Sequence, residues 1–196
     1  MIKRLFDIIF SFVGIALLLP ILLIIAFLIK IESKGSLFYL QTRVGKHHKD
    51  FKIFKFRTML VDSDKKGLLT LGDRDPRITK IGYFLRKYKL DELPQLINVL
   101  IGNMSFVGPR PEVRKYVNYY SKEDDIIFSV KPGITDYASI SFRNEAELLK
   151  TTNNPETYYI EHILPEKLKL NKEYINSNNL FTDLKIIFKT FIIIIE

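Results

Sequence analysis

The sequence predicts a helix-rich α+β protein in which an apolar N-terminal helix enters a membrane and a small domain follows. One long apolar run lies near the N-terminus, two strand-like segments follow around a short polar loop, and helical periodicity prevails in later segments. The length of 196 residues is enough for one folding unit of ordinary size. We therefore expect two parts, a membrane segment at residues 1–30 and one domain with a short β-hairpin and amphipathic interfacial helices at residues 31–196.

The composition favours an anionic partner. Lys and Arg number 30 against 22 Asp and Glu, which gives a formal net charge of +8. The stretch from Gln41 to Leu90, with 14 basic and 5 acidic residues, accounts for the whole surplus. A phosphate-bearing ligand, an anionic membrane or a nucleic acid would suit this charge. The chain has no cysteine, which excludes disulfides, thiol nucleophiles and cysteine-based zinc sites.

The apolar run Leu5–Ile29 has 25 residues, and a straight helix of that length would cover about 37 Å. Pro20 divides it into arms of roughly 22 and 15 Å, each shorter than the ~30 Å of a bilayer's hydrocarbon. Lys3, Arg4 and Lys30 put positive charge on both flanks, which favours the cytoplasm for both ends. A re-entrant hairpin satisfies both observations. A kinked single span is the alternative, because spanning helices tolerate proline.

The segments Ser36–Val44 and Phe51–Met59 are predicted to be strands on either side of the polar loop at residues 45–50. Side chains alternate between the two faces of a strand. Lys55 and Arg57 are therefore expected to project the same way at the end of the second strand. The alternative is a solvated basic strand edge, which is the usual use of such lysines.

Two helices are predicted in the middle of the chain. Asp75-Pro76 resembles a helix cap followed by proline at the first helical position. A second helix is expected to open near Asp91, which places Asp91 and Glu92 at a helix N-terminus. The C-terminal third is expected to be helical, and its last segment, Leu180–Glu196, is predicted to pack on the core or to lie in a membrane interface.

The Asp91-Glu92 pair is the strongest candidate for chemistry. Helix capping is the ordinary explanation of such a pair. Here, however, a basic stretch precedes the pair and an arginine-bearing Gly/Pro loop at residues 102–111 follows it. Carboxylates among arginines suit a phosphate ligand held together with a divalent cation. A carboxylate can also attack phosphorus to form an acyl phosphate.

Two other functions remain open from the residues alone. The triplets Asp62-Ser63-Asp64 and Asp73-Arg74-Asp75 have the Asp-x-Asp pattern of metal-dependent glycosyltransferases, which would release UDP. A membrane-tethered module that binds nucleic acid or anionic lipid would need the basic stretch but not Asp91 and Glu92. The chain has neither a P-loop nor a Gly-x-Gly-x-x-Gly motif, which argues against the common nucleotide-binding folds.

Ordered motifs along nearly the whole chain carry a resemblance to a known family. They are Lys3-Arg4-Leu5-Phe6-Asp7, the proline-broken apolar run, Lys55-Phe56-Arg57-Thr58-Met59, Asp75-Pro76-Arg77-Ile78-Thr79, Leu85-Arg86, Leu90-Asp91-Glu92-Leu93-Pro94-Gln95, Gly102-Asn103-Met104-Ser105-Phe106-Val107-Gly108-Pro109-Arg110-Pro111 and Pro132-Gly133-Ile134-Thr135. With these motifs the chain resembles the bacterial sugar transferases known as monotopic phosphoglycosyl transferases. It departs from them at Asn103, where Asp is commoner, and at Asp136-Tyr137-Ala138, which replaces Gly-Trp-Ala and which we expect to affect substrate choice.

The resemblance implies a location in the bacterial inner membrane. Residues 1–30 would form a re-entrant helix-break-helix that is entered and left from the cytoplasmic face, with its bend at Leu19 and Pro20. Lys3 and Arg4 would contact lipid headgroups, and the catalytic domain would face the cytoplasm. Anionic lipids are then expected partners, and nucleic acid is not.

The resemblance also implies transfer of a phosphosugar from a UDP-sugar to polyprenyl (undecaprenyl) phosphate with release of UMP, as the first membrane step of surface glycan assembly. Asp91 would be the nucleophile, Glu92 would assist the metal or a proton transfer, and Mg²⁺ would bind at this pair. The residues expected to bind the phosphates are Arg86, Arg110 and Arg143, with Lys55 and Arg57 as further candidates. Neither the sugar nor the oligomeric state follows from the sequence.

Overall fold

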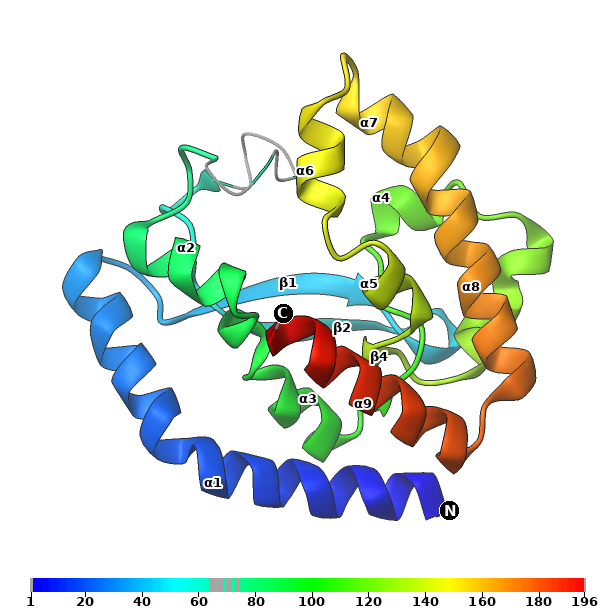
Figure 1. Cartoon of the computed structure of the whole chain (residues 1–196), viewed down its shortest axis with the longest axis horizontal. Coiled ribbons are helices and arrows are strands. Elements are labelled where there is room, and N and C mark those ends of the chain that lie inside the picture. The colour runs from blue at the N-terminus through cyan, green and yellow to red at the C-terminus, as the bar shows by residue number, and fades with distance from the viewer. Residues whose placement is uncertain (1, 64–68, 70–71, 73–74, 196) are drawn as a thin grey trace.

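The computed structural model describes residues 2–63, 69, 72 and 75–195. A long bent helix, α1 (Ile2–Glu32), runs along one side of a helix-rich domain that contains two small two-stranded sheets (Figure 1). After the first hairpin come α2 (Lys80–Lys87) and α3 (Gln95–Ile101). From Tyr137 onward the described part of the chain is mostly helical. The predicted helix-rich α+β class is therefore confirmed.

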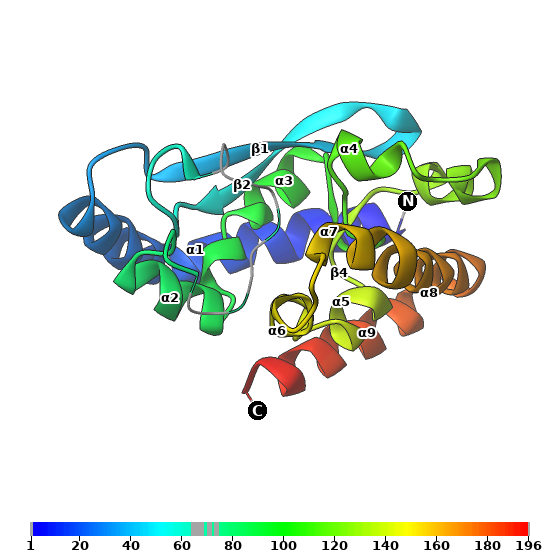
Figure 2. The same ribbon diagram turned by 90° about the horizontal axis from the view of Figure 1, so that it is seen from above.

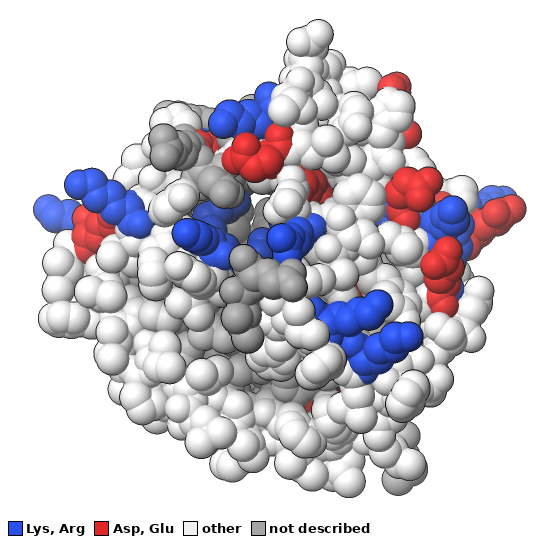
Figure 3. All heavy atoms as spheres, viewed as in Figure 1, with Lys and Arg blue, Asp and Glu red and all other residues white. Residues whose placement is uncertain are grey.

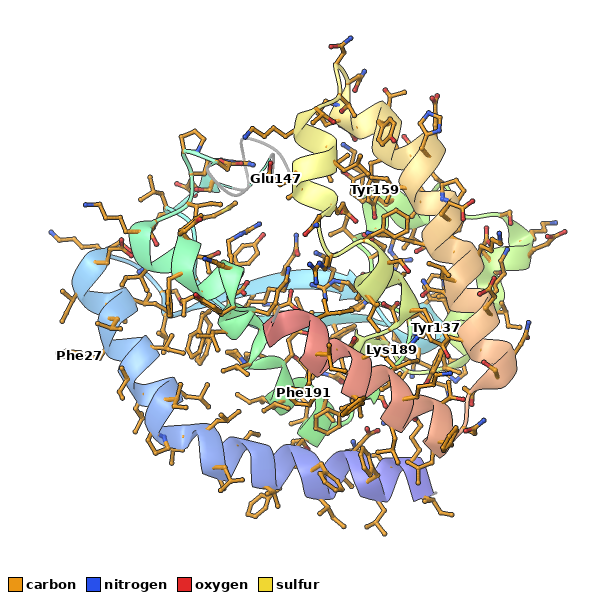
Figure 4. All side chains as sticks on the ribbon, in the orientation of Figure 1. Phe27, Tyr137, Glu147, Tyr159, Lys189 and Phe191 are labelled. Carbon is orange, nitrogen blue, oxygen red and sulfur yellow. The ribbon has the colours of Figure 1, made fainter. Side chains whose placement is uncertain are left out.

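α1 is a single helix of 31 residues that continues through Pro20. It bends near its middle (Figure 1), and Pro20 gives the physical cause because its ring removes one backbone hydrogen bond. Within the described residues, α1 is the one helix long and apolar enough to cross a membrane, yet little of it is covered by protein. Phe27, for example, projects outward from α1 (Figure 4). The expected break is thus a bend, and insertion as a re-entrant hairpin stays a prediction.

The predicted hairpin is present. Strand β1 (Phe38–Val44) pairs antiparallel with β2 (Asp50–Phe56), so that Tyr39 lies opposite Lys55 and Arg43 opposite Phe51. A short 3-10 turn, η1 (Lys46–His48), connects the strands. β2 ends before Arg57, so this residue lies just beyond the strand.

The prediction that a helix begins at Asp75-Pro76 is wrong. α2 begins at Lys80, and the hydroxyl of Thr79 caps it by accepting a hydrogen bond from the Gly82 backbone at 2.9 Å. Asp75 is buried and instead accepts hydrogen bonds from the backbone and the guanidinium of Arg77. The ion pair between the buried Asp75 and the partly buried Arg77 replaces the capping role that the sequence pattern predicts for Asp75.

The second predicted helix is present with one refinement. Leu90–Glu92 form a single 3-10 turn, η3, and the α-helix α3 begins only after Pro94. α3 packs against α1, where the Arg4 guanidinium donates hydrogen bonds to the carbonyls of Val99 and Leu100 at 2.6 and 2.8 Å. Asp91 and Glu92 therefore lie on a turn held between α2 and a helix anchored to α1.

A close approach between two loops builds the second sheet. Strand β3 (Ser105–Val107) pairs in parallel with β4 (Gly133–Thr135). A Cβ atom on Gly133 would lie 2.1 Å from the Gly108 backbone nitrogen, so only glycine fits there. The two Gly/Pro loops of the sequence thereby meet, and Arg110 follows directly after this crossing.

The remaining elements cover the two sheets. They are α4 (Arg114–Val117), η4 (Lys122–Ser129), α5 (Tyr137–Ser141), α6 (Glu145–Lys150), α7 (Pro155–Tyr158), the π-helical turn η5 (Tyr159–Ile163), α8 (Leu164–Ser177) and α9 (Leu180–Ile195). The buried side chains of Leu149, Tyr159 and Ile163 belong to the largest core cluster in this half. Seen from above, α2 lies on one side of the molecule and α5, α6 and α9 lie on the other (Figure 2).

The C-terminal helix α9 is amphipathic, as the sequence predicts. Ile186 is fully buried against Val107 of β3, which confirms that the helix packs on the core. Phe181, Phe188 and Phe191 remain largely exposed. This helix therefore combines a packed inner face with an apolar outer face. Its contact with a membrane interface stays a prediction.

Candidate active site

A cavity of about 790 Å³ lies between the side of the domain that carries α2 and the side that carries α5, α6 and α9. Its walls come from both strands of the hairpin, from α2 and η3, from the loop after β3, and from α5, α6, α8 and α9. Lys and Arg side chains gather around a hollow in this face of the molecule, whereas the surface along the lower edge, where the first part of α1 runs, is almost free of charged residues (Figure 3). The cavity has the size and the charge expected for a phosphate-bearing small molecule.

Glu92 lies in this cavity between two cations. The Lys55 ammonium donates to Oε1 at 2.8 Å, and the Arg110 guanidinium donates to Oε2 at 3.0 Å and also to Oε1. Burial alone would raise the pKa of Glu92, but Arg110 and Lys55 hold it well below its usual range. The charges of Arg110 and Lys55 therefore favour the ionised form of Glu92, which binds both cations.

Asp91 is adjacent to Glu92 in the sequence, but its surroundings differ from those of Glu92. It is 7% exposed, and its Oδ1 has no hydrogen-bond partner among the residues that the structure describes. Burial, followed by the neighbouring charge of Glu92, raises the pKa of Asp91, and the charges of Lys55, Arg86 and Lys89 oppose this shift. Glu92 lines the cavity, whereas Asp91 is not among its lining residues. An unpartnered carboxylate oxygen next to a basic cavity is a candidate nucleophile or metal ligand.

Arg110 is positioned by Asp136. The Arg110 backbone N–H donates to Asp136 Oδ2 at 2.9 Å, and the Ser139 backbone N–H donates to Asp136 Oδ1 at 2.6 Å, which caps α5. The charge of Glu92 raises the pKa of Arg110 above its usual value. The segment at residues 136–138, where the sequence departs from the family pattern, thus orients a cation of the site.

The structure brings Lys55, Arg86 and Arg110 together around Asp91 and Glu92. Arg86, in the last turn of α2, lines the cavity and acts electrostatically on Asp91. Lys55 contacts Glu92 directly, and the burial of Lys55 lowers its pKa. These placements agree with the predicted phosphate-binding role, which stays a prediction.

Two other candidate cations line the same cavity but have different partners. Arg57 donates to the carbonyls of Ser33, at 2.8 Å, and Lys34, just beyond the end of α1. Lys55 contacts Glu92 instead, so the two residues predicted to project the same way line one cavity with different partners, and Arg57 lies just beyond the end of β2. Arg143 follows α5 and donates to the Ile193 carbonyl of α9 at 3.3 Å.

The two basic residues expected at lipid headgroups contact protein groups. Lys3 forms an ion pair with the buried Asp183 of α9 and donates to Tyr174 Oη at 2.9 Å. Arg4 donates to α3, as described above. Leu19 and Pro20 are exposed on α1. The contacts of Lys3 and Arg4 anchor α1 to the domain, and their contact with headgroups stays a prediction.

The Asp-x-Asp triplets are only partly described. Asp64, Asp73 and Arg74 lie outside the described residues. Asp62 lines the cavity, and Asp75 is ion-paired with Arg77. In the described ranges, no cluster of three or more His, Asp and Glu side chains has a metal-binding arrangement.

Several residues of the cavity escaped the sequence reasoning. Lys89 precedes the carboxylate pair in a left-handed conformation (φ 54°) and lines the cavity. Gln41 and Arg43 also line it. Strand alternation together with the hairpin register would have placed both on the face of Lys55. No local pattern announces the left-handed backbone of Lys89, which is set by the packing of α2 against η3.

Comparison with known proteins identifies the family of the chain. The family model described as bacterial sugar transferase matches residues 1–196. An Aeromonas hydrophila protein named UDP-N-acetylgalactosamine-undecaprenyl-phosphate N-acetylgalactosaminephosphotransferase is 39% identical over 194 residues, which are 96% of this chain and 42% of the relative. The UDP-glucose:undecaprenyl-phosphate glucose-1-phosphate transferase of Escherichia coli (strain K12) is 37% identical over 194 residues, 97% of this chain and 39% of the relative.

A shorter relative is matched over most of its length. The exopolysaccharide production protein ExoY of Rhizobium meliloti (strain 1021) is 34% identical over 205 residues, 97% of this chain and 84% of the relative. The chain spans about two fifths of the Aeromonas and Escherichia relatives. Because the family model covers every residue, the resemblance of the sequence motifs is confirmed, and the chain belongs to the bacterial sugar transferase family.

Proposed function

We propose that this chain transfers a sugar phosphate from a UDP-sugar to polyprenyl phosphate at the cytoplasmic face of the bacterial inner membrane. One observation carries the proposal: a buried carboxylate with an unpartnered oxygen, Asp91, adjoins a carboxylate clamped by Lys55 and Arg110 at a basic cavity. The names of the Aeromonas and Escherichia relatives describe the same class of reaction. Such a transfer is the first membrane step in the assembly of a surface glycan.

Asp91 is the proposed nucleophile. A carboxylate oxygen of Asp91 attacks the sugar-bearing phosphorus, an O–P bond forms, and the P–O bond to UMP breaks, so that UMP leaves with the bonding electron pair. A phosphate oxygen of the acceptor lipid then attacks the same phosphorus and returns the Asp91 carboxylate. The missing partner of Oδ1 among the described residues supports this role, because none of them has to give up a hydrogen bond to that oxygen before the attack.

Glu92 is better suited to holding cations than to moving protons. A general base works best when its pKa is near the working pH, and that of Glu92 lies well below the usual range. Its contacts instead fix Lys55 and Arg110 beside Asp91. These cations lower the repulsion between an anionic nucleophile and an anionic phosphate. Arg86, Lys89 and Arg143 add positive charge along the cavity.

The residues present fit Mg²⁺ in one respect. The unpartnered Oδ1 of Asp91 is a suitable hard ligand, and Mg²⁺ in phosphoryl-transfer sites takes one or two carboxylates together with substrate phosphates and water. Both oxygens of Glu92 already accept hydrogen bonds from Lys55 or Arg110. Glu92 would therefore have to release one of these two cations before it could bind Mg²⁺. When bound, Mg²⁺ would supply positive charge to the diphosphate.

The apolar surface supports a membrane location. The exposed side chains of α1 include Leu17 and Phe27, at 74% and 66%, and the outer face of α9 adds Phe188 at 68%. A basic site with buried carboxylates is costly in hydrocarbon, so the cavity belongs at the interface, where both the soluble donor and the lipid phosphate can reach it. A re-entrant α1 with its bend at Pro20 gives this placement. Anionic lipids add about 1 kcal/mol of attraction per Lys or Arg near the surface.

Nucleotide release tests the proposal. The full chain in detergent would receive polyprenyl phosphate, Mg²⁺ and a panel of UDP-sugars, with Asp91→Asn and the matched surface variant Asp125→Asn in parallel. We expect the wild type and Asp125→Asn to release UMP from one sugar, and Asp91→Asn to release none. Release of UDP would contradict the proposal and point to an Asp-x-Asp glycosyltransferase. Salt-sensitive lipid or nucleic-acid binding without release would point to a binding module.

A further inference from the structure

Two buried polar atoms, on residues that line the cavity, have no hydrogen-bond partner in the part of the chain that the structure describes. They are Oδ1 of Asn171 on α8 and Oγ of Ser139 on α5. Asn171 is 5% exposed. Buried polar groups in folded proteins are almost always paired, and unpaired ones destabilise the fold. Violations of this kind concentrate where a ligand completes the pairing.

Near Asn171, Lys167 and Arg43 each pair with a carboxylate of their own, whereas Lys55 and Arg110 near Asp91 share the one carboxylate of Glu92. Lys167, one helical turn before Asn171, forms an ion pair with Glu145 and lies 5.0 Å from the centre of the Tyr159 ring. The Tyr159 hydroxyl donates to Glu112 at 2.6 Å, and Glu112 in turn pairs with Arg43 at 3.4 Å. This part of the cavity thus offers hydrogen bonds and aromatic surface, and its Lys167 and Arg43 already pair with carboxylates. Its chemistry suits a neutral, polar group.

Ser139 connects this region with the reaction centre. Its backbone N–H and that of Arg110 donate to the two oxygens of the same Asp136 carboxylate. Arg110 in turn contacts Glu92. One ligand that reaches both regions therefore has phosphate at Arg110 and a neutral hydrogen-bonding group beyond Ser139. A nucleoside diphosphate sugar has this composition, whereas the part of polyprenyl phosphate beyond its phosphate is hydrocarbon.

We infer that Asn171 and Ser139 form a subsite for the neutral hydrogen-bonding part of the donor, the glycosyl group or the base. This inference rests on the proposed function for the identity of the donor. It assigns donor recognition to α5 and α8, far along the chain from Asp91. It also accounts for the unpaired atoms, since the bound donor supplies their partners.

Steady-state UMP release by three variants tests the subsite. Asn171→Leu keeps the size of the side chain and removes the unpaired oxygen, Ser139→Ala removes the hydroxyl but keeps the backbone N–H that binds Asp136, and Asn176→Leu makes the same exchange at an exposed position of α8. We expect each of the first two to raise KM for the UDP-sugar on the order of tenfold, as for the loss of one hydrogen bond, with kcat within about threefold. Asn176→Leu should leave both constants unchanged.

The thermal midpoint separates binding from a structural role. Removing an unpaired buried oxygen should leave the midpoint of Asn171→Leu equal to that of the wild type or above it. Inhibition by UMP then shows which part of the donor, the glycosyl group or the base, occupies the subsite. A KM that rises while the UMP inhibition constant is unchanged places the glycosyl group at the subsite, and a parallel rise of both constants places the base there.

The inference is overturned if both variants keep the KM of the wild type and of Asn176→Leu. It is also overturned if a raised KM comes with a lowered thermal midpoint, because Asn171 would then support the fold. Failure of the proposed function looks different, since the wild type itself would then release no UMP.

Discussion

The guanidinium of Arg110 forms a bidentate ion pair with Glu92, in which Nη1 lies 3.0 Å from Oε2 and Nη2 contacts Oε1. Lys55 donates to the same carboxylate. The negative charge of Glu92 is therefore neutralised by two cations, but it still acts on Asp91 and raises the pKa of that carboxyl. This relationship makes the two adjacent carboxylates unequal.

Glu92→Gln should lower kcat and also move the acid limb of the pH profile to lower pH. Glutamine removes the charge that raises the pKa of Asp91 and leaves Lys55 and Arg110 without a counter-charge, so both effects lower that pKa. The ionised form of Asp91 then persists to lower pH. The measurement is kcat/KM for UMP release against pH in both proteins. An acid limb that stays in place or moves to higher pH would contradict the electrostatic coupling.

Asp91→Asn should raise the thermal midpoint at neutral pH by a few degrees. The pKa of Asp91 is higher in the folded state than in the unfolded state, so the ionised carboxylate destabilises the fold at pH values above both. At this chain length, 1 kcal/mol corresponds to about 2–4 °C. The difference between variant and wild type should shrink as the pH falls through the pKa of the folded state. Scanning fluorimetry from pH 8 to pH 5 checks this, and a lowered midpoint at pH 8 would argue against an unpaired Asp91.

Lys3→Met should destabilise the protein even when no lipid is present. Lys3 is the partner of Asp183, which is 3% exposed, and loss of the ammonium leaves a buried carboxylate with Tyr174 alone. The expected loss is about 1–3 kcal/mol. Lys30→Met, at the other end of α1, removes only an exposed hydrogen bond to Gly35 and serves as the control. An unchanged midpoint together with weaker binding to anionic vesicles would instead favour the headgroup role.

Pro20→Ala should favour a spanning α1. Alanine restores the backbone hydrogen bond that proline removes, so the helix straightens to a length that crosses the bilayer. The chain has no cysteine, and Ile2→Cys therefore gives a single reporter. In intact cells an impermeant thiol reagent should miss this cysteine in the Ile2→Cys protein and label it when Pro20→Ala is added. Labelling without Pro20→Ala would show that the natural helix already spans the membrane.

Much of the fold follows from local sequence patterns. The apolar run, the hairpin and the helix after Pro94 are each encoded by local periodicity or backbone chemistry, and all are present. The wrong helix start at Asp75 shows where such patterns fail, because two local signals compete there. Asp75 is buried in contact with Arg77, and the Thr79 hydroxyl caps the helix instead.

The candidate site was predictable where its residues are neighbours in sequence and not where tertiary packing assembles it. Asp91 and Glu92 are adjacent, and their motif announces them. Their unequal environments depend on Lys55 and Arg110, which are distant in the chain and are brought in by the hairpin and by the Gly108–Gly133 crossing. No sequence pattern indicated a role for Asn171, because only the packing of α8 on α5 places this residue at the cavity.

The most direct test of the central claim is the reaction with donor alone. The full chain is mixed with its UDP-sugar and Mg²⁺ in the absence of polyprenyl phosphate, and intact mass and UMP are measured together. A covalent intermediate on Asp91 predicts UMP at up to one equivalent per active site, a mass increase equal to the phosphosugar, and loss of both in Asp91→Asn. UMP that forms only when the lipid acceptor is added, or a mass increase that persists in Asp91→Asn, would contradict the assignment of Asp91 as the nucleophile.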